Sequence, residues 1–179
     1  MRAIALSSLV LCACGSAQAP SGSAGVTPGI AQPGVVVGLT SREAIEAELP
    51  SWRDAAAGAD PEDDTARQLA SVPPGAEIDV FLGTWCGDSR REVTRLFRAL
   101  ELVPEPWPFT IRWIGVDRAK RAPGLSDGVD LRYVPTIIVR RDGSEVGRVV
   151  ESAPRSIERE LLDLLTGTSR GTITARTDL

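Results

Sequence analysis

The sequence predicts an α/β domain with a central mixed sheet of about four strands, flanked by helices and preceded by a helical extension. An apolar run at 77–82, a segment with helical spacing and a second apolar run at 109–116 predict a strand, a helix and a parallel strand. Two further runs, at 136–140 and 145–150, flank Asp142-Gly143, which is a strong hairpin signal. A last amphipathic segment predicts a closing helix.

Composition limits the function classes that need to be considered. The chain has 179 residues, of which 42% are hydrophobic, enough for one ordinary core. Its net charge of −4 gives no basic face for nucleic acid. It contains no histidine, which excludes Ser-His-Asp and Cys-His catalysis and histidine metal sites. We therefore expect no metal, no cofactor and no nucleic-acid partner.

The first residues resemble a bacterial lipoprotein signal. Met1-Arg2 precedes an apolar run that is too short to span a membrane, which indicates a signal peptide over 1–13. Leu11-Cys12-Ala13-Cys14 resembles a lipobox, so we expect Cys14 to be the lipidated first residue of the mature protein. Soluble secretion by cleavage after Ala17-Gln18-Ala19 is the alternative.

The resemblance to Gram-negative lipoproteins also implies a location. No acidic residue follows the lipid site to suggest retention at an inner membrane, because Gly15-Ser16 comes next. We therefore expect a lipid anchor on the periplasmic face of the outer membrane. Residues 14–38 are rich in Gly, Ser, Ala and Pro, and residues 15–38 carry no charge, which predicts a flexible tether.

Ordered structure is expected from Thr40, in a helical extension over 39–72. Thr40 and Glu43 fit a capping box in front of a short helix. Asp60-Pro61 is typical of the start of a second helix, which runs to about Val72. The acidic cluster 62–64 matches the charge of a helix N-terminus better than it matches a metal site.

The remaining elements belong to a domain predicted over 73–167. Pro73-Pro74-Gly75 separates the extension from the first strand, and three prolines end the next helix. Residues 117–132 predict an irregular loop. The closing helix begins at about Pro154 and stops at Gly167, and a C-terminal tail over 168–179 is expected to fray. The inward-facing positions of the two helices are Val93, Leu96, Phe97 and Leu100, and Ile157, Leu161, Leu164 and Leu165.

The pentapeptide Trp85-Cys86-Gly87-Asp88-Ser89 lies between the first strand and its helix. Cys86 is the single cysteine outside the N-terminal apolar segment, so the mature domain cannot form an internal disulfide. A helix N-terminus favours a thiolate over a thiol, which predisposes Cys86 to react. The arginines that follow at helical spacing fit a solvated face better than a site for an anionic substrate. They are Arg91, Arg95 and Arg98.

These residues resemble the thioredoxin superfamily. Trp85-Cys86-Gly87 between a strand and a helix is similar to the active-site motif of that family. Tyr133-Val134-Pro135-Thr136 resembles its cis-proline loop, and the match covers roughly residues 75–166. The resemblance implies a thioredoxin-like fold with Cys86 as nucleophile. It further implies substrate contacts from Trp85, Gly87, Val134, Pro135 and Thr136.

Two positions depart from the family pattern. Ser89 stands where dithiol members carry the resolving cysteine, and a hydroxyl cannot form the second sulfur bond. Ser89 is a candidate catalytic residue that could donate a hydrogen bond to the sulfur of Cys86; the alternative is a polar residue that only belongs to the first turn of the helix. Val80 stands where the family has a buried acid. Both departures affect the resolving step rather than the first attack.

Three functions follow from these residues. The leading hypothesis is a monothiol disulfide exchange protein or isomerase, whose partners are protein thiols or disulfides, with a small-molecule thiol as a further candidate. The alternative is a redox-inactive binding module that holds a partner at the cis-proline groove. A single-cysteine peroxidase is less favoured, because Phe81-Leu82-Gly83-Thr84 lacks the Thr/Pro arrangement that peroxiredoxin-like sites place before their cysteine.

Overall fold

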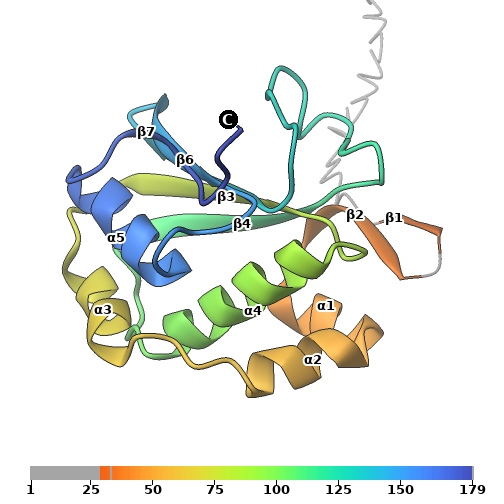
Figure 1. Ribbon diagram of the computed structural model, residues 1–179, viewed down its shortest axis with the longest axis horizontal. Coiled ribbons are helices and arrows are strands. Elements are labelled where there is room, and N and C mark those ends of the chain that lie inside the picture. The colour runs from red at the N-terminus through yellow and green to blue at the C-terminus, as the bar shows by residue number, and fades with distance from the viewer. Residues whose placement is uncertain (1–28, 33, 179) are drawn as a thin grey trace, which may run out of the picture.

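The computed structural model describes residues 29–32 and 34–178, which form a sheet with helices packed against it (Figure 1). Within these residues the sheet has seven strands in the order β1-β2-β4-β3-β5-β6-β7. The expectation of about four strands was too low. The strands are β1 (Gly29–Gln32), β2 (Val35–Thr40), β3 (Ala76–Leu82), β4 (Phe109–Gly115), β5 (Thr136–Arg141), β6 (Ser144–Val150) and β7 (Gly171–Ile173).

The four predicted strands form the centre of the sheet. β3 and β4 are parallel and are joined by helix α4 (Gly87–Glu101), while β5 is antiparallel to β3 on its other side. β5 and β6 form the predicted hairpin. Its turn residues Asp142 and Gly143 have φ values of 53° and 74°, the left-handed conformation that an Asp-Gly turn supplies at low cost.

The strand β2 corrects the expected tether over 14–38. It pairs antiparallel with β4, and its residues Val35 and Val36 are buried. Three consecutive β-branched residues favour a strand even without charged neighbours. A Cβ atom on Gly115 would lie 2.4 Å from the carbonyl oxygen of Val36, so glycine is needed where β2 meets β4. The expected signal peptide over 1–13 and the expected lipidation site Cys14 lie outside the described residues.

The strand β7 corrects the expectation of a frayed tail over 168–179. It pairs in parallel with the edge of β6, with Gly147 opposite Gly171. A Cβ atom on Gly147 would lie 2.5 Å from the carbonyl oxygen of Gly171. The close approach of the two strands therefore depends on a glycine that the sequence does not mark as part of a strand pair.

All helices of the described chain lie on one side of the sheet (Figure 1). The extension has three α-helices where two helices were expected, and its first N-cap is Ser41 rather than Thr40. α3 begins at Asp63 rather than beside Asp60-Pro61. The helices besides α4 are α1 (Arg42–Glu48), α2 (Pro50–Ala57), α3 (Asp63–Gln68), the 3₁₀ turn η1 (Leu69–Ser71) and α5 (Ile157–Thr166).

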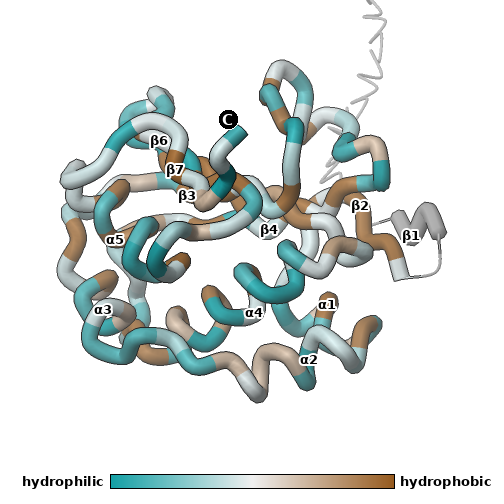
Figure 2. The backbone as a smooth tube through the Cα atoms, viewed as in Figure 1, coloured by the Kyte–Doolittle hydropathy of each residue, from teal (hydrophilic) through white to brown (hydrophobic). Residues whose placement is uncertain are grey.

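Hydrophobic residues form two clusters, one on each face of the sheet. The larger lies between the sheet and the helices, where Trp52 of α2 packs with α4 and α5 residues such as Phe97 and Leu161. The smaller includes Phe81 and Val134 and lies on the opposite face. Figure 2 shows hydrophobic stretches along the strands and alternating hydropathy along α4 and α5. Among the described helices, none has the length and apolar character needed to cross a membrane.

Candidate functional site

Cys86 lies where β3 hands over to α4, as the N-cap residue of that helix. Its backbone N–H donates to the carbonyl of Gly83 at 2.9 Å, which closes the turn in front of the helix. Its side chain is half-buried, and it is the free cysteine of the described residues. The thiol donates a hydrogen bond to the carbonyl oxygen of Val134 at an Sγ–O distance of 3.3 Å. Cys86 therefore faces the proline loop.

The proline loop, residues 133–136, is held beside the thiol by hydrogen bonds. The Val134–Pro135 peptide bond is cis, which is the geometry that the resemblance implied. Val134 and Thr136 are almost fully buried. The Thr136 hydroxyl donates to the carbonyl of Tyr133 at 2.8 Å, and the Glu151 N–H donates to the carbonyl of Pro135 at 2.7 Å. Thr136 thus supports the loop from within instead of offering its hydroxyl to a ligand.

Trp85 and Gly87 flank the thiol in different environments. The indole N–H of Trp85 donates to the carbonyl of Val116 at 3.2 Å, and the Arg118 guanidinium lies 5.5 Å from the ring centre. A Cβ atom on Gly83 would lie 2.8 Å from the Trp85 ring, so the indole packs directly on glycine. Gly87, the first residue of α4, is exposed.

Ser89 is fully buried one helical turn after Cys86. Its hydroxyl oxygen accepts a hydrogen bond from the Gly83 N–H at 3.1 Å. The thiol of Cys86 donates to the carbonyl of Val134. Ser89 and Cys86 thus each bind a different backbone group. Ser89 holds the turn that presents the thiol, and it cannot resolve a mixed disulfide.

The position of the family's buried acid is apolar in this structure. Val80 is fully buried in the larger cluster, between the sheet and the helices. The neighbouring carboxylate, Asp79, is also buried, but successive strand residues point to opposite faces. Asp79 binds Arg112 at 2.7 Å and also pairs with Arg140, so its charge is used in holding β3, β4 and β5 together.

Arginines on α4 are engaged by carboxylates rather than free for an anionic ligand. Arg91 binds Asp88 at 2.7 Å and donates to the Ser152 hydroxyl at 2.6 Å. Arg98 pairs with Glu101. Arg95 binds the fully buried carboxylate of Glu158 at 2.7 Å. The interpretation of these arginines as a solvated face fits Arg91 and Arg98, whose side chains are more than a third exposed, whereas Arg95 has a structural role at the buried Glu158.

Two buried carboxylates near this face have shifted pKa values of opposite sign. Burial raises the pKa of Glu92, although Arg91 opposes the shift. For Glu158, burial also acts upward, but hydrogen bonds from Arg95 and from the Glu62 N–H outweigh it and lower the pKa. Glu158 is therefore held as an anion at neutral pH.

The turn in front of Cys86 is held by residues 34–36 and by Trp52 of the helical extension. These contacts were not predicted from the sequence. The Thr84 hydroxyl accepts from the Val36 N–H at 3.1 Å and donates to the Gly34 carbonyl at 2.7 Å. The indole N–H of Trp52 donates to the Thr84 carbonyl at 3.2 Å. The run Val35-Val36-Val37 is the sequence signal that could have indicated a strand here.

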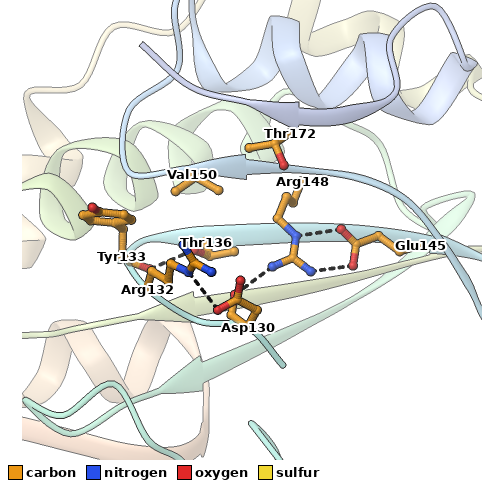
Figure 3. A pocket seen from close by; sticks show the side chains of 8 residues that line it. All are labelled: Asp130, Arg132, Tyr133, Thr136, Glu145, Arg148, Val150 and Thr172. Carbon is orange, nitrogen blue, oxygen red and sulfur yellow. Dashed lines mark hydrogen bonds and ion pairs between the residues drawn. The ribbon is translucent and has the colours of Figure 1, made fainter. Parts of the chain in front are cut away.

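Two clefts border this region. One, of about 340 Å³, lies between α2 and the first turns of α4 and is lined in part by Gly87, Arg90 and Arg91. The other, of about 480 Å³, lies on the sheet face opposite the helices and begins at Tyr133 (Figure 3). Its charged side chains are already paired, Arg132 with Asp130 and Arg148 with Glu145. Within residues 34–178, no group of histidine, cysteine and carboxylate side chains is arranged to hold a metal ion.

Comparison with known proteins gives thioredoxin-like relatives at low identity. No family model matches the chain. Over 84 residues, 47% of the chain, it is 23% identical to the mitochondrial thioredoxin-3 of Saccharomyces cerevisiae, and the match spans 61% of that protein. This similarity supports thioredoxin-like homology.

Two solved structures are also similar to this chain. One is a Pseudomonas aeruginosa protein of unknown function, with 17% identity, a TM-score of 0.44 and coverage of 67% of this chain and 82% of that one. The other is oxidized yeast mitochondrial thioredoxin 3, with 16% identity, a TM-score of 0.34 and coverage of 63% of this chain and 98% of that one.

Proposed function

We propose that this thioredoxin-like chain is a monothiol disulfide exchange protein in which Cys86 is the nucleophile. The observation that carries the proposal is the position of its sulfur, at the N-terminus of α4 and 3.3 Å from the carbonyl of Val134 beside Pro135. The sulfur belongs to the N-cap residue of α4, next to N–H groups that have no partner within the helix. Cys86 is half-buried and so is not sealed in the interior of the protein.

The exchange proceeds in two balanced steps. The thiolate of Cys86 attacks one sulfur of a partner disulfide, a new S–S bond forms, and the second partner sulfur leaves as a thiolate that takes up a proton. Because Ser89 cannot attack in turn, a thiol from outside the chain attacks the mixed disulfide and releases Cys86. Trp85, Gly87 and the backbone of Val134 and Pro135 would border the bound partner.

The test uses the full chain with Cys12→Ser and Cys14→Ser, so that Cys86 is the single thiol. The protein is incubated with a peptide carrying a mixed disulfide with glutathione, quenched with acid and measured by mass spectrometry. We expect a covalent adduct on Cys86 that reduced glutathione removes and that Cys86→Ser abolishes. A thiol that iodoacetamide alkylates but that forms no adduct with the disulfide would refute the proposal.

A second candidate is a binding module without redox function. It is favoured by two departures from the family pattern, because Ser89 stands at the position of the resolving cysteine and the apolar Val80 at that of the buried acid, and both are fully buried. Thiols are blocked in a native envelope extract prepared without reductant, and the chain is then isolated with its partners. Partners that are released by reductant and lost in Cys86→Ser support exchange, whereas partners kept without a covalent link support binding.

The proposal includes attachment to the cell envelope through a lipid on Cys14, facing the periplasm from the outer membrane. The resemblance of Leu11-Cys12-Ala13-Cys14 to a lipobox supports it. Growth with a clickable fatty acid should label the protein, and Cys14→Ala should remove the label. Label that is absent, or that survives Cys14→Ala, would contradict the anchor.

A further inference from the structure

The segment 174–178, which follows β7, reaches the end of the sheet where Cys86 lies. β6 finishes opposite the start of β5, since Val150 pairs with Thr136 directly after the proline loop. β7 runs parallel to β6, so the chain leaves β7 in the direction of that loop. Figure 1 shows the C-terminal end of the chain on the sheet face opposite the helices.

Three contacts hold this segment to the rest of the protein. The Ala175 N–H donates to the carbonyl of Ser152 at 2.9 Å. The Arg176 guanidinium binds Glu151 at 2.6 Å and lies 4.2 Å from the centre of the Tyr133 ring. Asp178 binds the same guanidinium at 2.8 and 2.6 Å. Arg176 therefore joins the proline loop to the loop that follows β6.

Both loops are connected to Cys86 or to the helix that follows it. Cys86 contacts Val134, and Glu151 binds the carbonyl of Pro135. Ser152 receives the side chain of Arg91, which lies on the same helix as Cys86. These contacts link Cys86 to the proline loop, to Glu151 and, through Arg91, to Ser152, and the segment 174–178 is fastened to this series at Tyr133, Glu151 and Ser152.

We propose that the segment 174–178, fixed by Arg176, is a wall of the Cys86 groove that admits small thiols and disulfides and restricts polypeptide partners. The inference rests on the proposed function, because it concerns access to the same sulfur. A polypeptide leaving Cys86 across Glu151 and Ser152 meets chain that is already in place. The Ser152 carbonyl, which could otherwise pair with such a partner, already accepts from Ala175.

The test measures access to Cys86 by alkylation, which does not require exchange chemistry. The full chain with Cys12→Ser and Cys14→Ser is treated with N-ethylmaleimide or with a maleimide carrying a long polyethylene glycol chain. The variants are Arg176→Ala and a chain ending at Thr174. Arg170→Ala is the matched control, because Arg170 is an exposed arginine just before β7.

We expect Arg176→Ala to raise the rate of the bulky reagent about fivefold, the effect of losing an exposed ion pair and a cation–π contact. The chain ending at Thr174 should react with the bulky reagent at least as fast as Arg176→Ala does. The rate with N-ethylmaleimide should not change in any variant, and Arg170→Ala should not change the rate with either reagent. If Arg176→Ala raised the alkylation rate equally with both reagents, or with neither, the proposal that segment 174–178 limits access to Cys86 would be wrong. Failure of the disulfide test with this selectivity intact would instead contradict the exchange function.

Discussion

The sulfur of Cys86 is presented by a turn whose residues each have a separate role. Ser89 binds the N–H of Gly83, Cys86 binds the carbonyl of Gly83, and the Trp85 ring packs on the Gly83 α-carbon. Gly83 thus has no room for a side chain although its backbone conformation would allow one. The thiol, in turn, contacts the carbonyl of Val134. Thiol presentation therefore depends on neighbours that do not react.

Gly83→Ala tests this packing. The added methyl group would lie 2.8 Å from the Trp85 ring and must displace it. We expect a loss of about 1–3 kcal/mol in the free energy of unfolding, as for other overpacked sites, measured by urea denaturation. Gly87→Ala is the control, because a Cβ atom there meets nothing within 4 Å. Equal stability of the two variants would contradict the prediction.

At the scale of elements, β2 supports the turn before Cys86 through a single side chain. The Thr84 hydroxyl makes two hydrogen bonds to the backbone in front of the helical extension, at Val36 of β2 and at Gly34 just before it. Trp52 of α2 adds a third bond, to the Thr84 carbonyl. The extension is therefore part of the structure that positions the thiol, rather than an appendage to the domain.

Thr84→Val removes the hydroxyl while keeping a β-branched side chain of similar size. The Val36 N–H and the Gly34 carbonyl lose their partner, which should cost about 1–3 kcal/mol of unfolding free energy. Thr110→Val, at an exposed position of β4, provides the matched comparison in a thermal or urea melt. If both valine variants unfolded at the same urea concentration, the hydrogen bonds of the Thr84 hydroxyl would not stabilise the fold.

Glu158 joins three helices, because its carboxylate, on α5, binds Arg95 on α4 and the Glu62 N–H before α3. Its lowered pKa means that the ionised form stabilises the fold at neutral pH. This contribution is fully present above the unfolded pKa of about 4.3 and is lost as the pH falls through the lower folded value.

Glu158→Gln should therefore destabilise the protein at pH 7 by roughly 2 kcal/mol, a value reduced by the partial exposure of Arg95. The difference in unfolding free energy between Glu158→Gln and the unmodified chain should shrink as the pH falls below about 4, because the carboxylate of Glu158 is then protonated. Urea melts across this pH range measure it. Glu105→Gln, at an exposed glutamate, serves as the control. A difference that stays constant with pH would contradict the assignment.

For the whole molecule, the larger hydrophobic cluster includes residues from the extension and from the thioredoxin-like domain. Ile45 and Trp52 are buried in the same cluster as Phe97 of α4 and Leu161 of α5. β2 also extends the sheet beside β4. Because core and sheet are continuous, residues 34–178 are expected to unfold as one cooperative unit.

Thermal unfolding should then show a single transition. Fluorescence of a variant with Trp107→Phe and Trp113→Phe reports on the extension and the turn through Trp52 and Trp85, whereas far-ultraviolet circular dichroism reports on all helices and strands. We expect the two midpoints to coincide. A fluorescence change that precedes the loss of secondary structure would indicate that the extension unfolds separately, and the shared core would then be too weak to couple the two parts.

The sequence by itself determined the order β3, α4, β4, β5, β6 and α5, together with the position of Cys86 between a strand and a helix. These features follow from local periodicity and from the Asp142-Gly143 turn, which neighbouring residues encode. Only the tertiary structure decided that β2 and β7 extend the sheet, that Thr84 is bound to Gly34 and that Arg176 lies against Tyr133. The contacts of Thr84 with Gly34 and of Arg176 with Tyr133 join residues more than forty positions apart, and β7 pairs with residues 24 positions earlier in the chain. The partner that makes a short segment a strand, or a side chain a support, therefore lies outside the segment whose sequence is being interpreted.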